Sequence, residues 1–159
     1  MCSAMASRRT DLVTGALVGY AASRTMDAAT TAFYARQGEA SKRREQELAP
    51  GGSLFQLGRQ LATAAGRTAD DATAARIGVG VHRSLGVGYG VLAAVLVRRG
   101  WSPWAAGPAV GLGAFLVVDE GTSLPQLTDY PPVSHLRGVV GHATWGLAAG
   151  ALLAALGRR

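Results

Sequence analysis

The sequence predicts an all-α, integral membrane four-helix bundle with a short amphipathic connecting helix. Two windows, residues 100–118 and 138–157, run for 19 and 20 residues without a formal charge, which is close to the ~20 residues that cross a bilayer. Residues 146–156 contain no polar side chain, whereas a helix in a soluble core normally carries a polar stripe. Pairs of arginines stand beside the apolar windows, as is typical of membrane topology signals.

Composition limits the alternatives. A chain of 159 residues is enough for one domain, here a single membrane domain over residues 1–159. The net charge is +6, but 15 of the 16 basic residues are Arg. A bias toward Arg, Gly and Ala also arises in GC-rich genomes, so we expect no nucleic-acid partner. The single cysteine, Cys2, excludes an internal disulfide framework and a cysteine-based zinc site.

The first predicted span covers residues 12–33, provided that Arg24 and Asp27 are housed near one of its ends. The stretch 35–48 is polar but permits a helix, so the first helix is expected to continue beyond the bilayer. Pro50, followed by two glycines, then ends that helix.

The connecting segment, residues 34–76, contains the predicted amphipathic helix. Its apolar residues fall near one helical face: Leu54, Phe55, Leu57, Leu61 and Ala62. Such a helix usually lies on a membrane surface or packs on a neighbouring helix. Asp70 and Asp71, which follow Thr68, resemble the start of the helix that leads into the second span.

The remaining three predicted spans cover residues 77–97, 104–124 and 135–156. The second span requires that His82 and Arg83 be housed near one end. Before the third span, Ser102 is a suitable helix cap and Pro103 suits the first helical position.

The placement of basic residues predicts the orientation. Four spans bring three arginine pairs to the same side, which the positive-inside rule makes the cytoplasm: Arg8 and Arg9, Arg98 and Arg99, Arg158 and Arg159. Both termini are therefore expected in the cytoplasm, and the loop 121–134, which has no basic residue, outside. The connecting segment opposes this orientation, because its basic residues would also lie outside.

Glycines at a spacing of four residues predict close helix packing. In a bilayer, helices associate through close backbone approach rather than by hydrophobic exclusion. Each predicted span supplies one such pair: Gly15 and Gly19, Gly86 and Gly90, Gly107 and Gly111, Gly146 and Gly150.

Ionisable residues from all four spans are expected at one level of the bundle. At about 1.5 Å per residue, those counted from the cytoplasmic anchors lie roughly 22 to 24 Å into the bilayer. We expect them to face inward, pair, or line an outward-opening polar pocket, since unpaired charge at this depth is costly. The predicted pocket contains Arg24, Asp27, His82, Arg83, Asp119, Glu120, His135, Arg137 and His142.

The same residues allow several kinds of site. A buried salt-bridge network would fix the register of the helices, whereas a functional pocket would hold protons, an ion or a small ligand. A zinc, iron or manganese site would draw on His82, His142, Asp119 and Glu120, with His135 as a further ligand. A haem between His82 and His142 is a further alternative. No residue pattern indicates a catalytic nucleophile.

In the second half of the chain, a Gly-rich helix that opens with His82 is followed by a helix with Gly107 and Gly111, a Pro-rich loop and the run Gly141-His142-Ala143-Thr144-Trp145. This order of features resembles the YagU-like family of small bacterial inner-membrane proteins. The resemblance covers roughly residues 77–157. It implies about four spans in the bacterial inner membrane, a loose association with acid tolerance and no established enzyme activity. The matching positions are His82, Gly107, Gly111, Gly141, His142 and Trp145.

Three functional hypotheses follow. The first is a multi-pass membrane protein that senses or passes protons or small ions through its polar pocket. The second is a structural or accessory subunit whose glycine faces bind another membrane protein or a second copy. The third is a metal- or haem-dependent membrane enzyme. The sequence identifies the lipid bilayer as a partner but no particular cofactor.

Overall fold

The computed structural model describes residues 2–120 and 129–157, with side chains described from residue 12 onward. Within these residues all regular structure is helical, so the predicted all-α class is confirmed. The elements are α1 (Cys2–Ala35), α2 (Glu39–Leu48), α3 (Ser53–Ala64), α4 (Asp71–Arg98), α5 (Pro103–Ala114), η1 (Phe115–Glu120) and α6 (Pro132–Leu156).

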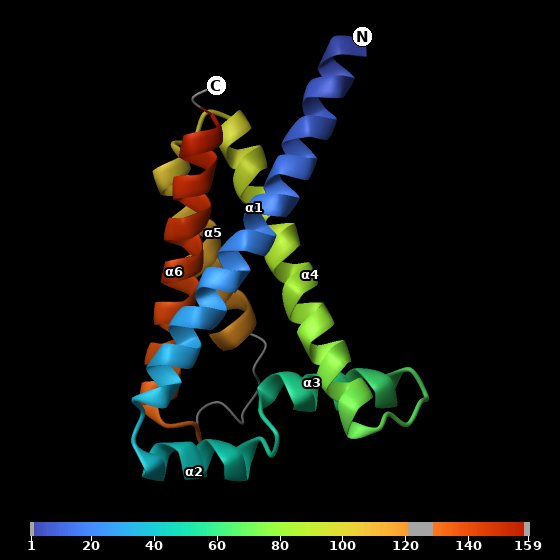
Figure 1. Ribbon diagram of the computed structural model, residues 1–159, viewed down its shortest axis with the longest axis vertical. Helices are drawn as coiled ribbons and strands as arrows, with labels where there is room; N and C mark the ends of the chain where they lie inside the picture. Colours follow the sequence, from blue (N-terminus) through green and yellow to red (C-terminus); the bar gives the residue numbers. More distant parts are fainter. Residues whose placement is uncertain (1, 121–128, 158–159) are drawn as a thin grey trace.

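The four long segments form two pairs (Figure 1). Helices α1 and α4 cross, α5 lies beside α6, and α1 also packs on α6. The start of α1, the end of α6 and the turn between α4 and α5 lie at one end of the molecule. Helices α2 and α3 lie at the opposite end, which we call the base.

The first helix ends earlier than predicted. It stops at Ala35, and the chain turns before α2 begins. The prediction that the first helix continues to residue 48 is therefore wrong. The backbone of Gly38, with φ −65° and ψ 145°, is extended and interrupts the helix. The predicted break before the amphipathic helix is confirmed, since Gly51 and Gly52 adopt positive φ angles of 81° and 94° that favour glycine.

Two predicted helix starts are confirmed. The side chain of Asp70 accepts a hydrogen bond of 2.7 Å from the Thr73 amide at the start of α4. The Ser102 hydroxyl accepts one of 3.3 Å from the Trp104 amide, and Pro103 occupies the first position of α5. Both caps satisfy amide groups that have no partner within the helix.

The third predicted span is divided between two elements. Helix α5 passes directly into η1, a π-helix that ends at Glu120. A π-helix widens the helical turn and is frequent at functional sites. The end of the predicted span and most of the predicted outer loop lie at 121–128, outside the described residues.

The predicted glycine contacts are confirmed. A Cβ atom added to Gly90 would overlap the backbone of Gly15 and Gly19, so α1 and α4 cross on glycine. A Cβ on Gly107 would likewise overlap the backbone of Gly146, where α5 meets α6. The fold also uses glycines that were not predicted to make contacts, since Gly58 of α3 meets the backbone of α4 and Gly78 of α4 meets the backbone of α3.

Small residues make up much of the interior, and many large apolar residues lie on the surface. The apolar side chains with no exposed surface are alanines, namely Ala22, Ala74, Ala93, Ala106 and Ala149. Larger side chains are also buried, namely Val18, Val110, Trp145 and Leu153. Exposed side chains include Leu17, Leu85, Leu116, Val117 and Leu147.

Two described helices, α4 and α6, are long and apolar enough to cross a membrane. Only 22% of the apolar window in α4 and 44% of that in α6 are buried within the chain. Most residues of these two windows are therefore not buried against the rest of the chain. Helices α1 and α5 are not among the described helices that meet the combined criteria, so the predicted bundle of four membrane spans is not confirmed.

Candidate functional site

The first polar group joins α1 to α4, and we call it the Asp27 cluster. One carboxylate oxygen of Asp27 lies 3.1 Å from Nε2 of His82, and the other lies 2.5 Å from a guanidinium nitrogen of Arg83. The ring of Tyr20 lies 5.8 Å from the Arg83 guanidinium. Asp27 is thus held between two basic side chains of the neighbouring helix.

The glycine crossing explains how these residues meet. Gly86 has no side chain, and a Cβ there would overlap the hydroxyl of Ser23 on α1. Asp27 lies four residues after Ser23, while Arg83 lies three residues before Gly86. Since residues three or four apart share a helix face, the close approach of the backbones places the two charges together one turn away.

The second polar group joins η1 to α6. An oxygen of Asp119 lies 3.2 Å from Nε2 of His142, which is 8% exposed. The Phe115 ring packs against the imidazole with their centroids 5.8 Å apart. Gly138 leaves room for this arrangement, since a Cβ there would lie 2.8 Å from the Phe115 ring and 3.2 Å from the Asp119 carboxylate.

A third pair joins the same two elements nearer the base. Nδ1 of His135 lies 2.7 Å from an oxygen of Glu120, and about a third of each side chain is exposed. Each of the three histidines therefore lies beside a carboxylate that belongs to a different element. We refer to these as the three His–carboxylate pairs.

Arg137 takes a partner that the sequence did not indicate. Its guanidinium donates to both oxygens of Glu45, at 3.1 and 2.9 Å, and to Gln37 at 2.8 Å. The Ser134 hydroxyl donates to Glu45 at 2.5 Å, and the guanidinium lies 5.0 Å from the Tyr34 ring. We call this group, which joins α2 to α6 and the end of α1, the Glu45 network.

Electrostatics in the Glu45 network favour the ionised carboxylate. Burial raises the pKa of Glu45, but hydrogen bonds from Arg137, Ser134 and Gln37 lower it further than burial raises it. Its pKa is therefore below the ordinary value of 4.5. The sequence did not identify Glu45 as a site residue, because it lies in a strongly polar stretch where a carboxylate is usually exposed to solvent.

Arg24 differs from the other predicted pocket residues. Its side chain is exposed, and within residues 12–120 and 129–157 no acidic side chain forms an ion pair with it. Asp27, one turn further along α1, is instead occupied by Arg83 and His82. Arg24 thus lies outside the paired groups that the structure brings together.

The predicted metal ligands are distributed over separate pairs. His82 lies with Asp27, His142 with Asp119, and Glu120 with His135. In the described part of the chain, no group of three or more His, Cys, Asp or Glu residues could hold a metal ion. No protein geometry in that part favours the metal interpretation.

Two of the polar groups lie in contacting helices at neighbouring positions. A Cβ on Gly141 of α6 would lie 2.6 Å from the methyl group of Thr30 and 3.3 Å from that of Met26, both on α1. Met26 precedes Asp27, and Gly141 precedes His142. The contact of α1 with α6 therefore lies beside both the Asp27 cluster and the Asp119–His142 pair.

Two buried donors near these groups have no acceptor among the described residues. They are Nε1 of Trp145 and one guanidinium nitrogen of Arg83. Trp145 is 2% exposed and packs edge-on against the Tyr89 ring at 6.2 Å. Buried donors are nearly always satisfied by protein or by ordered water. Both positions are thus places where a water molecule could bind inside the bundle.

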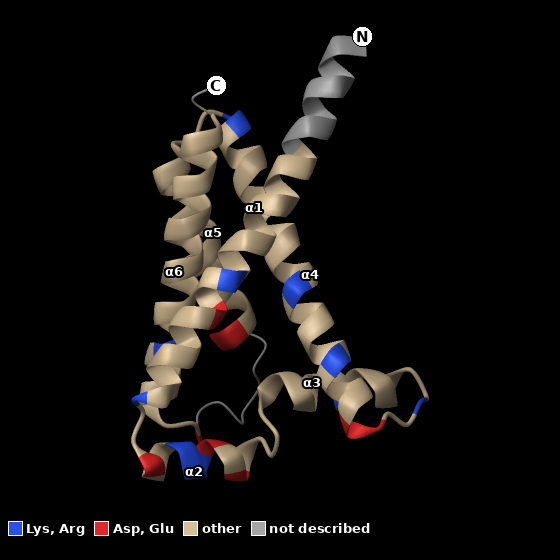
Figure 2. Ribbon diagram, in the orientation of Figure 1, with Lys and Arg blue, Asp and Glu red and all other residues tan. Residues whose placement is uncertain are grey.

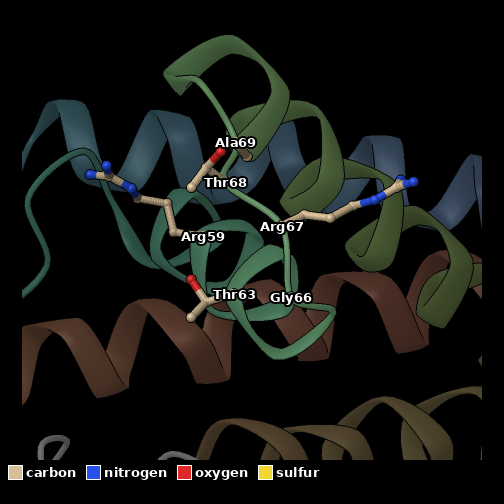
Figure 3. Close-up of a pocket in the computed structure, with 6 residues that line it drawn as sticks. All are labelled: Arg59, Thr63, Gly66, Arg67, Thr68 and Ala69. Carbon is tan, nitrogen blue, oxygen red and sulfur yellow. The ribbon is translucent and has the colours of Figure 1, made fainter.

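The base carries a separate surface hollow at the turn between α3 and α4 (Figure 3). It has a volume of about 380 Å³. The side chains of Arg59, on α3, and Arg67, in the turn, point in opposite directions, so their guanidinium groups do not converge on one point. The hollow is lined by Arg59, Thr63, Gly66, Arg67, Thr68 and Ala69.

No protein-family model, curated protein or solved structure gives a significant match to the chain. The resemblance to the YagU-like family thus gains no support from these comparisons.

Proposed function

We propose that the chain is a multi-pass integral membrane protein of the bacterial inner membrane, with α1, α4, α5 continued by η1, and α6 as its four spans. The exposed leucines and valines, together with an interior of glycine and alanine, support this proposal. Soluble proteins rarely expose large contiguous apolar surfaces, whereas small residues at helix contacts are typical of membrane bundles.

The distribution of charge supports the same arrangement (Figure 2). Among the residues that Figure 2 colours, charged residues gather in the half toward the base, and the other half carries charge at the end of α4, beside the turn to α5. Arg98 and Arg99 lie in that turn. By the positive-inside rule they support a cytoplasmic location for this end of the bundle, and with it for the start of α1 and the end of α6.

Reporter fusions test this topology. An alkaline phosphatase fusion ending at Gly66 should be active outside the cytoplasm, and one ending at Arg159 should be inactive. Extraction of membranes with alkaline carbonate should leave the full chain in the membrane fraction. Reversed fusion activities would contradict the orientation, and extraction by carbonate would contradict the integral membrane assignment.

We further propose that the polar groups sense protons or pass them between the faces of the bundle. The observation that carries this proposal is that all three histidines lie beside carboxylates from other elements, at 2.7 to 3.2 Å. Histidine changes charge near neutral pH more readily than any other side chain. Its protonation here would convert a neutral–anionic contact between two elements into an ion pair.

Within the Asp27 cluster the roles can be distinguished. Arg83 is a permanent cation, and its guanidinium pairs with one oxygen of Asp27 at 2.5 Å. The other oxygen faces Nε2 of His82, so in this proposal the imidazole is the group of the cluster that binds and releases the proton. Asp119 and His142 form a second His–carboxylate pair beside the α1–α6 contact.

The test combines transport with titration. Protein reconstituted in vesicles that contain a pH-sensitive dye should relax an imposed proton gradient faster than empty vesicles. His82→Ala and His142→Ala should each abolish the increase, whereas Ser84→Ala, an exposed position on the same helix as His82, should not. If the wild type does not relax the gradient but its imidazole signals titrate in NMR spectra, sensing remains and passage fails. If neither occurs, the proposal fails.

A structural role is the second candidate. The contacts of Asp27 with two basic side chains of α4 would fix the register between α1 and α4 without any proton movement. Each predicted glycine pair is already occupied by another helix of the same chain. Partner binding through those glycine faces is consequently not proposed. Asp27→Asn would then reduce stability while leaving any proton-linked response unchanged.

A further inference from the structure

The base contains arginines that internal ion pairs leave free. Its acidic side chains are mostly occupied: Glu39 by Lys42 at 2.9 Å, Glu47 by Arg44 at 3.4 Å, Glu45 by Arg137, and Asp70 by the cap of α4. Within the described part of the chain, five base arginines form no ion pair: Arg36, Arg43, Arg59, Arg67 and Arg76. Three of these five lie in α3, in the turn into α4 or in the first turns of α4.

Helix α3 also presents apolar side chains outward. Its inner edge packs on α4, because Gly58 and Gly78 let the two backbones approach. Leu54 and Leu61 remain 36% and 40% exposed. Arg59 lies over the ring of Phe55 at 5.4 Å, so a guanidinium and an apolar surface occur on the same helix. A short helix with both features is typical of a membrane interface.

Two adjoining hollows lie on this surface, and both have polar and apolar lining. The first, about 380 Å³, lies between the polar side chains of Arg59 and Arg67. The second, about 650 Å³, shares the turn 66–69 and extends over Leu61 and Ile77. Tight capture of a single free phosphate ion needs donors that converge on it. Arg59 and Arg67 diverge (Figure 3), which instead suits a layer of several phosphate groups with apolar chains beside them.

We infer that α3 and the turn into α4 dock on the headgroups of anionic phospholipids. Arg59 and Arg67 contact lipid phosphates on either side of the first hollow, and Leu61 and Ile77 contact the adjoining acyl chains. The inference rests on the proposed membrane location, since the base then lies at one bilayer surface. It adds a preferred lipid class and the residues that select it.

Thermal unfolding of the full chain in detergent tests the inference. Added phosphatidylglycerol should raise the wild-type Tm by about 3 °C more than phosphatidylcholine does. The variant Arg59→Gln/Arg67→Gln should lose this difference. The variant Arg36→Gln/Arg43→Gln removes the same amount of charge from exposed positions at the same end, and it should retain the difference.

Several results would overturn the inference. Equal Tm values in the two lipids for the wild type would show no preference for anionic lipid. An equal loss in the Arg36/Arg43 control would show diffuse charge attraction rather than docking at α3. An equal shift with inorganic phosphate would identify a phosphate-ion site instead. Membrane location itself is judged separately by carbonate extraction, so failure of the lipid preference does not imply failure of the proposed function.

Discussion

The guanidinium of Arg137 meets the carboxylate of Glu45 at 2.9 Å, although the two residues are 92 positions apart in the chain. This contact attaches the base helix α2 to the start of α6. Only 22% of the Arg137 side chain and 11% of the Glu45 side chain are exposed. Removal of either partner would consequently leave a charge or a strong hydrogen-bonding group largely shielded from water.

Arg137→Gln should lower the free energy of unfolding by about 3 kcal/mol, because it leaves the Glu45 carboxylate without its cation. The double variant Glu45→Gln/Arg137→Gln should recover part of this loss. Arg44→Gln, which removes the exposed partner of Glu47, should cost less than about 1 kcal/mol. Denaturation in mixed micelles measures all three values. A similar cost for Arg137→Gln and Arg44→Gln would contradict the structural role of the Glu45 network.

Stability should fall on acidification in a way that depends on Glu45. Burial raises its pKa, but the hydrogen bonds from Arg137, Ser134 and Gln37 outweigh burial, so the folded-state pKa lies below the ordinary 4.5. The carboxylate therefore contributes stability that is fully present above pH 4.5 and is lost as the pH falls through the folded-state pKa. Unfolding free energies measured from pH 6 downward should decline less in Glu45→Gln than in the wild type, whereas Glu47→Gln should follow the wild type.

Two glycines of α4 provide a matched comparison of packing. A Cβ on Gly90 would overlap the backbone of α1, while a Cβ on Gly88 has no atom of another element within 4 Å. Gly90→Ala should thus lower the Tm markedly. Gly88→Ala should leave it unchanged or raise it, since alanine favours a helix by up to about 1 kcal/mol over glycine. Equal effects of the two substitutions would mean that α1 and α4 do not cross on glycine.

A methyl group added at Gly138 should change the environment of His142, because Phe115 and Asp119 lie between the two positions. Gly138→Ala would push against the Phe115 ring and the Asp119 carboxylate, because its Cβ would lie 2.8 and 3.2 Å from them. We expect a shift of the His142 imidazole signals in NMR spectra. Gly113→Ala, which has open space around it, is the control and should leave them in place. Unchanged His142 signals in Gly138→Ala would contradict the contact between His142 and Asp119.

Most of the helices could be predicted from the sequence because their signals are local. The Asp70 and Ser102 caps and the glycine spacings act within a few residues, and the structure confirms them. The end of α1 was not predicted correctly, because residues 35–48 favour a helix throughout. The structure shows two helices there, joined by a turn at Gly38.

The candidate site was predicted by residue type but not by pairing. Counting residues along the helices placed Asp27, His82 and Arg83 near one level, because α1 begins and α4 ends at the same end of the molecule. The structure brings these three residues into contact. Glu45 gave no such signal, because its partner on α6 is known only once the chain turns back at the base. Long-range pairs of this kind depend on the tertiary fold, to which neither spacing nor composition is sensitive.

The crossing of α1 and α4 has a consequence for how the sequence can vary. Every single-base change in a glycine codon that alters the amino acid adds at least a Cβ atom, so mutations at Gly15, Gly19 and Gly90 meet backbone directly. Leu17, Leu85 and Leu147 face outward and can exchange with other apolar residues. Relatives of this chain should accordingly be recognised by fixed glycines at intervals of four, with freely changing leucines around them.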